Sequence, residues 1–219
     1  MSDTPLLAEP LILKKPWTAL ARQREAATFG IWAFLASEVL FFGALFLAYT
    51  MARLENPEAF AIAARQTNAF YGTLNTAILL TSSLTMAVAA QAASTKADFR
   101  RLIVGCLAAT AALGIAFLIV KGFEYREDFA KHLVPGSDFA LPQPAAQIFF
   151  ALYWTITGVH AIHLAIGILL VLRLTLVGAL RRLPLRCNPQ VEVTALYWHL
   201  VDIIWVFVYP LIYLPGRGA

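Results

Sequence analysis

The stretch FGIWAFLASEVLFFGALFLAYT, residues 29–50, decides the fold class of this 219-residue chain. As an α-helix it would rise about 33 Å, enough to cross the hydrocarbon core of a bilayer. One carboxylic acid, Glu38, stands near its centre. On insertion scales a charge at this depth costs about 2.5–3.5 kcal/mol, so it indicates a function or a buried partner. We expect Glu38 to be buried, neutral or hydrogen bonded, against His199 or the hydroxyl-rich second apolar segment.

The composition extends this interpretation to the whole chain. Hydrophobic residues make up 60% and charged residues 14%, whereas roughly 25% of residues are charged in a soluble domain. Five segments are long and apolar enough to span a membrane. We therefore predict an all-α, polytopic membrane protein with five transmembrane helices in one bundle. The predicted helices cover about residues 28–52, 70–93, 102–121, 145–172 and 193–214.

The chain is expected to comprise a leader, residues 1–27, and a membrane domain, residues 28–219. The larger share of Lys and Arg falls in the leader, in the second connection and in the fourth connection. Because positive residues near helix ends are retained in the cytoplasm, this distribution predicts a cytoplasmic N-terminus and a periplasmic C-terminus. The connection after the third span, residues 121–144, is expected to begin as a continuation of that helix and to end in a Pro-rich turn. Its charges are interpreted as a solvated loop, with Glu124 and Tyr125 as the exception.

Several functional classes are disfavoured by the same pattern. The net charge of +4 is divided among short connections beside apolar helices, which fits membrane topology and anionic headgroups better than nucleic acid. Cys106 and Cys187 have no metal-site spacing and are expected to be reduced and inert. No phosphate loop or nucleophile motif is present in the sequence.

The ionisable side chains at membrane depth are the candidate functional residues. Counting residues from the helix ends places them at similar depths, which predicts one buried polar layer. Two i, i+3 pairs occur among them, and residues at this spacing lie on neighbouring positions of a helix surface. The five residues are Glu38, His160, His163, His199 and Asp202.

Two further classes are weighed against a hydrogen-bonded bundle. A haem-binding electron carrier would use facing histidines, for which His163 and His199 qualify by depth. A small transporter would favour broken helices and internal repeats, and neither is visible in the sequence. A metal bound by Glu and His is disfavoured because no Glu-x-x-His motif occurs.

Four motifs resemble subunit III of haem-copper terminal oxidases, the cytochrome c oxidase type, in its short five-helix bacterial form. They are SEVLFF at residues 37–42, EY at 124–125, TGVHAIHLAIG at 157–167 and ALYWHLVDIIWVFVYPLIYL at 195–214. They stand in the family's order, and the last is the most specific. The positions matching recurrent polar and aromatic residues are Glu38, Glu124, His160, His163, Tyr197, Trp198, His199 and Asp202.

The resemblance implies an accessory subunit with no catalytic, metal or cofactor residue of its own. Haem and copper are expected in the partner subunits, namely catalytic subunit I, with subunit II as a second partner. The implied complex is a proton-pumping cytochrome c oxidase of aerobic respiration in the bacterial inner membrane. In it, this subunit would support proton uptake, stabilise the catalytic subunit and bind phospholipids. Other respiratory complexes are further candidate partners, and nucleic acid is not expected.

Longer family members have seven helices, and this chain begins at the third. Half of the family's lipid cleft is therefore missing, so no lipid-binding residue is assigned. The resemblance extends to subunit III of quinol oxidases and to a subunit III-like protein of nitric oxide reductases. Glu38 and Tyr197 favour cytochrome c as the donor, because the quinol type often carries Asp and Phe there.

Overall fold

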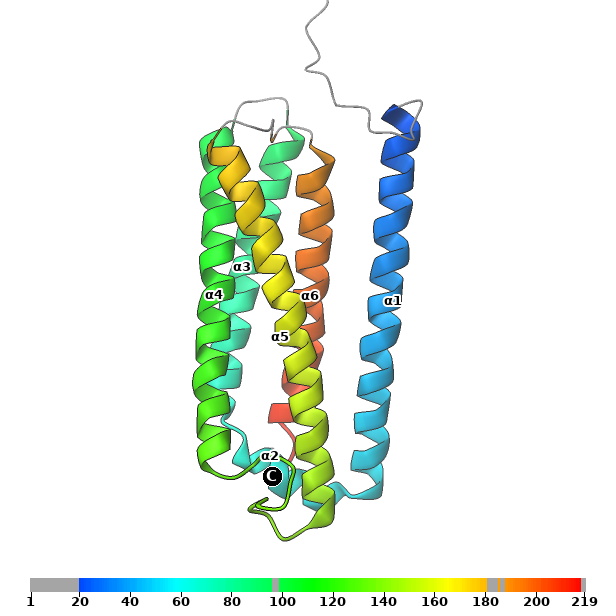
Figure 1. Ribbon diagram of the computed structural model, residues 1–219, viewed down its shortest axis with the longest axis vertical. Helices are drawn as coiled ribbons and strands as arrows, with labels where there is room; N and C mark the ends of the chain where they lie inside the picture. Colours follow the sequence, from blue (N-terminus) through cyan, green and yellow to red (C-terminus); the bar gives the residue numbers. More distant parts are fainter. Residues whose placement is uncertain (1–19, 96–98, 181–184, 186–187, 218–219) are drawn as a thin grey trace, which may run out of the picture.

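A computed structural model describes residues 20–95, 99–180, 185 and 188–217. The predicted leader therefore lies largely outside the described residues, as does Cys187. Among the described residues, the regular secondary structure is entirely α-helical (Figure 1). These helices are α1 (Leu20–Glu55), α2 (Pro57–Gln66), α3 (Ala69–Ser94), α4 (Arg100–Ala130), α5 (Pro144–Ala179) and α6 (Pro189–Tyr213).

Five of these helices are long and apolar enough to cross a membrane within the part of the chain that the structure describes. The predicted all-α fold with five spans is confirmed. Several helices run beyond their predicted spans. The largest extension is in α4, which continues to Ala130 instead of ending near residue 121. In this extension Glu124 and Asp128 are buried and accept hydrogen bonds from Tyr153 of α5 and Tyr213 of α6, which favours the helix over a solvated loop.

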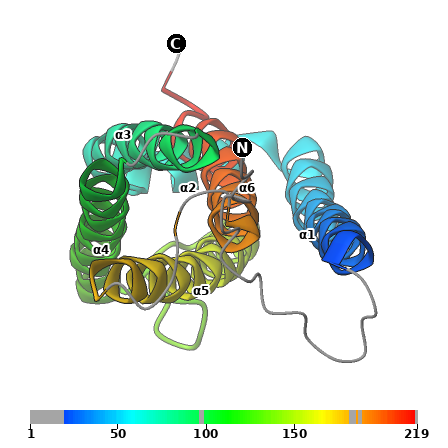
Figure 2. The ribbon, with the colours of Figure 1, turned by 90° about the horizontal axis from the view of Figure 1, so that it is seen from above.

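Helices α3, α4, α5 and α6 occupy the corners of a four-helix bundle, and α1 stands to one side of it (Figure 2). Consecutive spans run in opposite directions along the bundle. Helix α1 packs against α5 and α6. Only 11% of the residues in its most apolar window are buried within the chain, against 33–50% in the other spans. The expected single bundle therefore consists of a compact unit and a flanking helix.

Helix α2 is short and lies across one end of the bundle, which we call the α2 end (Figure 1). Its buried residues are Phe60, Ala63 and Ala64. The ring of Phe60 packs edge-on against Tyr49 of α1 and Phe149 of α5, with ring centroids 5.4 and 5.5 Å away. The sequence pattern did not predict this helix, because ten residues are too short to span a bilayer and a proline begins them.

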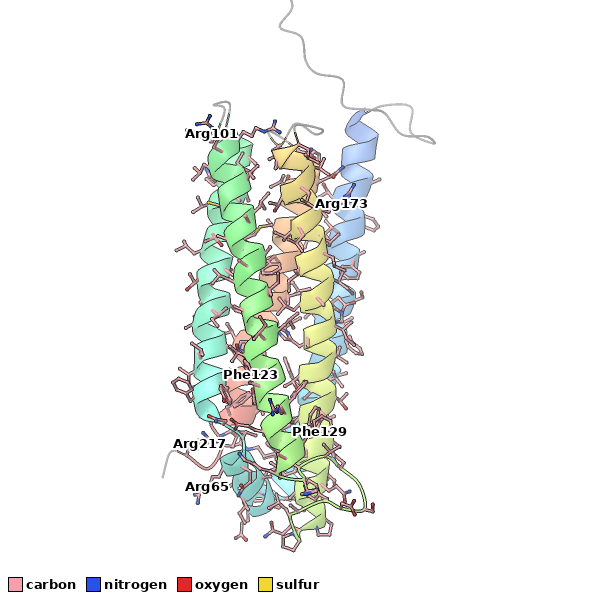
Figure 3. All side chains as sticks on the ribbon, turned by 60° about the vertical axis from the view of Figure 1, so that its left-hand side comes forward. Arg65, Arg101, Phe123, Phe129, Arg173 and Arg217 are labelled. Atoms are coloured by element: carbon pink, nitrogen blue, oxygen red, sulfur yellow. The ribbon has the colours of Figure 1, made fainter. Side chains whose placement is uncertain are left out.

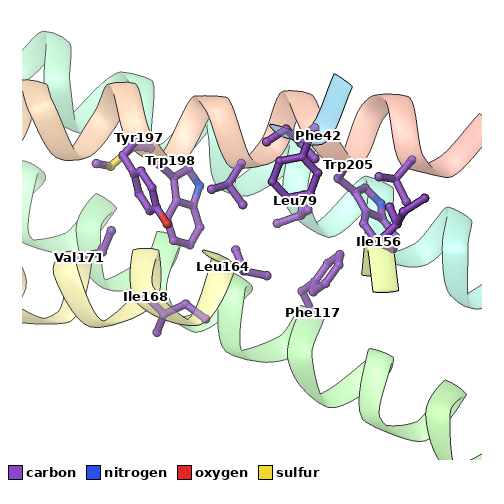
Figure 4. Packing of buried hydrophobic residues seen from close by; sticks show 14 of the residues in the cluster. Phe42, Leu79, Phe117, Ile156, Leu164, Ile168, Val171, Tyr197, Trp198 and Trp205 are labelled. Carbon is purple, nitrogen blue, oxygen red and sulfur yellow. The ribbon is translucent and has the colours of Figure 1, made fainter. Parts of the chain in front are cut away.

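The centre of the bundle is built around two tryptophans of α6, Trp198 and Trp205, both completely buried (Figure 4). Helix α4 meets Trp198 at Gly114, where a Cβ atom would come within 2.8 Å of the indole. Because real Cβ contacts are longer, a glycine is required for this close approach. Further along, the rings of Phe117 and Trp205 meet edge to face with centroids 4.7 Å apart.

Arginines mark both ends of the spans (Figure 3). Arg101 and Arg173 lie toward one end, and Arg65 and Arg217 lie at the α2 end. The latter two are bound to backbone: Arg65 Nε donates to the carbonyl of Gly216 at 2.7 Å, and Arg217 donates to the carbonyl of Ala64 at 2.9 Å. Which end faces the cytoplasm stays a prediction.

Candidate functional site

Glu38 forms a contact between α1 and α5. Its Oε2 lies 2.9 Å from Nε2 of His163, and the two side chains are 16% and 18% exposed. The expectation that His199 or α3 would hold Glu38 is wrong. His163 takes that role because it lies on the side of α5 that faces α1, whereas His199 meets α3, with Nδ1 2.8 Å from the hydroxyl of Ser83.

The other ring nitrogen of His163, Nδ1, shows where one proton of this pair lies. Nδ1 lies 2.9 Å from the carbonyl oxygen of Val159. A carbonyl can only accept, so Nδ1 carries a hydrogen. Attraction between Nε2 and Glu38 then requires at least one further proton, carried by either partner, and with one proton the pair is neutral. The contact is close, but the acceptor oxygen is not aligned for a hydrogen bond.

A second ionic group, which we call the lysine cluster, lies toward the α2 end and consists of Lys121, Glu124, Asp128, Tyr153 and Tyr213. Its centre is the ammonium group of Lys121, which is completely buried. Nζ donates to Glu124 Oε2 at 3.1 Å, to the hydroxyl of Tyr153 at 3.0 Å and to the hydroxyl of Tyr213 at 2.7 Å. All three donors of an ammonium are therefore used.

The acidic part of the lysine cluster is held by the two tyrosines. Tyr213 donates to Glu124 Oε1 at 2.7 Å. The hydroxyl of Tyr153 lies 3.0 Å from Glu124 Oε1 and 2.7 Å from Asp128 Oδ2. A phenol has one hydrogen, so it satisfies one of the two carboxylates at a time. The cluster thus combines two acids with one ammonium inside the protein.

Part of this cluster was visible in the sequence. Glu124 is a candidate from the sequence, but the interpretation of the charges of Lys121 and Asp128 as solvated is wrong. Lys121 and Asp128 are 1% and 2% exposed. Their spacing carries a signal, because residues 121, 124 and 128 follow the i, i+3, i+7 pattern of one helix face.

The predicted single polar layer is divided among three environments. Glu38 and His163 meet between α1 and α5, His199 meets Ser83, and His160 and Asp202 are enclosed in the bundle. Residues three apart differ by about 60° around a helix. Such a pair can therefore face different neighbours, as His160 and His163 do.

The two aromatic motif residues of α6 connect the bundle. The hydroxyl of Tyr197 donates to the backbone carbonyl of His163 at 3.0 Å. The indole of Trp198 donates to the hydroxyl of Ser82 at 3.2 Å. These bonds tie α6 to α5 and to α3. The bond from Tyr197 also anchors the turn of α5 that carries His163, the partner of Glu38.

Haem ligation would compete with some of these contacts. Ligation through Nε2 of His163 would displace Glu38, and ligation through Nδ1 of His199 would displace Ser83. No group of three His, Cys, Asp or Glu side chains suited to a metal ion occurs among the described residues.

Comparison with known proteins agrees with the motifs. A family model described as cytochrome c oxidase subunit III matches residues 19–217. Cytochrome c oxidase subunit 3 of Bacillus sp. (strain PS3) is 32% identical over 187 residues, covering 85% of this chain and 84% of the relative. Cytochrome bo(3) ubiquinol oxidase subunit 3 of Buchnera aphidicola subsp. Schizaphis graminum is 28% identical over 195 residues. These residues cover 88% of this chain and 96% of that relative.

A third relative joins two subunits in one chain. The heme-copper oxidase subunit I+III of Aeropyrum pernix is 32% identical over 193 residues, which cover 84% of this chain and 22% of that protein. Sequences similar to this chain thus occur both as separate subunits and as part of a fused polypeptide.

Proposed function

The chain belongs to the cytochrome c oxidase subunit III family and is a multi-pass membrane subunit of a haem-copper oxidase, and we propose that this oxidase takes electrons from cytochrome c and pumps protons. In this proposal the subunit is accessory. Haem and copper reside in its partners, and the complex lies in a bacterial inner membrane. The observation that carries the proposal is the family match over residues 19–217.

Membership in this family implies association with the catalytic subunit I, and the fused relative supports that partnership. Helix α1 is the element most open to such contact, because so little of it is covered within the chain. Its exposed apolar residues include Leu40, Leu47 and Leu54. We assign this surface to contacts with subunit I and with phospholipids; subunit II is the other proposed partner.

The Glu38–His163 pair is assigned a structural role at the seam between α1 and the bundle. One proton shared by two groups gives a neutral contact that apolar surroundings tolerate better than a bare carboxylate. Each group is partly exposed, and within the described part of the chain each makes its ionic contact with the other. We do not assign Glu38 as the proton donor of the pump.

The proposed support of the catalytic subunit is tested by removing this chain. Oxidase that lacks the subunit should reduce oxygen in its first turnovers, but should take up protons more slowly and lose activity sooner during continuous turnover than the complete complex. Restoring the wild-type chain is the control and should reverse both defects. Equal lifetimes with and without the subunit would contradict the supporting role.

The partners are tested by purification in mild detergent through a tag on this chain. A large subunit containing haem and copper should co-purify. Isolation of this chain alone, with a haem spectrum that disappears in His163→Ala or His199→Ala, would replace the proposal with an electron carrier.

A quinol oxidase is the second candidate, favoured by the similarity to a bo(3) ubiquinol oxidase subunit. Oxygen consumption by the purified complex distinguishes the two. Turnover with reduced cytochrome c and none with quinol supports the first proposal, and the reverse supports the second.

A further inference from the structure

Three polar side chains are enclosed by the bundle without a hydrogen-bond partner among the described residues. They are Asn75 of α3, His160 of α5 and Asp202 of α6, and their exposed fractions are 0%, 0% and 4%. Both polar atoms of each side chain are unpaired within that part of the chain. Buried polar groups in native proteins are nearly always satisfied by protein or by ordered water, so three such side chains in one bundle call for an explanation.

Contacts with Trp205 place the three residues at one depth. The Trp205 indole donates to the hydroxyl of Thr76 at 3.1 Å, and Asn75 directly precedes Thr76. The imidazole of His160 lies 5.1 Å from the Trp205 ring, centroid to centroid. Asp202 precedes Trp205 by three residues on α6. All three therefore lie within about one helical turn, 5.4 Å along the axis, of the same level.

These residues lie on helix faces that point toward the inside of the bundle. On α3 the buried positions Gly72, Asn75, Leu79 and Ser82 recur at helical spacing and form one face. On α6 Asp202 lies between Trp198 and Trp205, which bind α3 hydroxyls at 3.2 and 3.1 Å. The three unpaired side chains thus project from different helices toward a shared interior.

The nearest polar groups on either side are already occupied. Toward the α2 end, Lys121 uses all three donors within the lysine cluster. On the other side Ser83 lies beside Asp202, and its single hydroxyl hydrogen serves either Asp202 or His199 Nδ1, which lies 2.8 Å away. Phe117 packs edge-on against His160 with centroids 5.7 Å apart, and Trp205 covers another side. Among the described residues, these neighbours leave Asn75 and His160 unsatisfied and offer Asp202 at most one donor.

The chemistry of the three groups selects the ligand. An amide offers donors and an acceptor, a neutral imidazole offers one of each, and a carboxyl group adds acceptors. Water has the same mixed character and forms about three hydrogen bonds at a typical buried site. We propose that Asn75, His160 and Asp202 bind internal water at the centre of the α3–α6 bundle. This site is independent of the Glu38–His163 pair and of the identity of the electron donor.

Radiolytic labelling of the intact oxidase tests the site. An X-ray pulse converts bound water to hydroxyl radicals, which oxidise the side chains beside it. Phe117 and Phe149 are matched probes, because both are 0% exposed, but only Phe117 contacts His160. Phe117 should be oxidised several-fold faster than Phe149. Equal rates for the two rings would overturn the proposal.

Variants assign the signal to the three residues. His160→Leu and Asn75→Leu remove water-binding groups and should lower oxidation of Phe117 and Trp205 severalfold. Asp202→Asn retains polar atoms of the same shape and should keep the wild-type labelling. Unchanged labelling in both leucine variants would contradict the assignment.

High-resolution density of the wild-type oxidase provides a second measurement in case a variant fails to assemble. A water peak within hydrogen-bond distance of at least two of the three side chains is expected. Direct bonding of the three side chains to one another, or a metal ion at the peak by anomalous scattering, would overturn the proposal.

Discussion

The lysine cluster and the Glu38–His163 pair both consist of ionisable groups on the long apolar helices, but the protein encloses them differently. Lys121 and Glu124 have side chains 2% and 0% exposed, and bonds from α5 and α6 reach them. Glu38 and His163 are 16% and 18% exposed and join α1 to α5 alone. The lysine cluster is therefore part of the bundle core, whereas the pair lies at a seam.

This difference in burial determines how much stability a substitution in each group should cost. Removing one partner from a fully buried ion pair leaves a charge without compensation. A partly exposed pair is weaker, because solvent and lipid headgroups moderate the charge and the two groups can share one proton. Position in the tertiary structure, not residue type, thus predicts the energetic role of an intramembrane acid.

The largest effect is expected from Lys121→Met, which leaves Glu124 and Asp128 without their ammonium. The expected loss is about 3–5 kcal/mol of stability, seen as failed assembly or a lower unfolding temperature of the purified oxidase. The double variant Lys121→Met with Glu124→Gln should recover part of the loss. Wild-type stability of the single variant would show that Lys121 is not the charge that holds the cluster.

Substitutions of the two acids of the lysine cluster should cost different amounts of stability. Glu124→Gln removes the ion pair with Lys121 and should cost about 1.5–3 kcal/mol. Asp128→Asn keeps an acceptor for Tyr153 and removes the surplus negative charge, so we expect a change within about 1 kcal/mol. Thermal unfolding of the two purified variants measures both, and equal losses would contradict a cluster of two acids balanced by one ammonium.

The rigidity of the bundle around the cluster is tested by Gly114→Ala. The new Cβ would meet Trp198 and Ile168 at 2.8 and 2.9 Å, and overpacking of this kind costs about 1–3 kcal/mol. Gly105→Ala is the matched control, because no atom outside its own helix lies within 4 Å of that position. Unfolding temperatures of the two variants should separate, and equal values would show that α4 can move away.

The smallest effect is expected from Glu38→Gln at the seam. The amide can still contact His163, so assembly and stability should change by less than about 1 kcal/mol. Initial rates of oxygen reduction should stay near wild type, measured in the first turnovers with an oxygen electrode. Loss of those first cycles would assign Glu38 a direct part in proton transfer and abolish the contrast with the lysine cluster.

Much of the fold follows from local sequence, but the pairing of side chains does not. The apolar stretch at residues 29–50 predicted a spanning helix, and α1 covers it. The charges of residues 121–144 predict a solvated segment, but the average polarity of a segment does not show which helix face is buried. Tyr153 and Tyr213, distant in sequence, supply the bonds that bury Lys121.

The sequence alone determined five apolar helices and, through the motifs on α1, α5 and α6, the family. The length of each apolar run is a local property that the bilayer thickness interprets directly. Only the tertiary structure decided that Glu38 meets His163, that Lys121 is buried and that His160 and Asp202 face an interior without partners among the described residues. These outcomes depend on the rotation and depth of each helix against its neighbours, which the packing of the whole bundle sets.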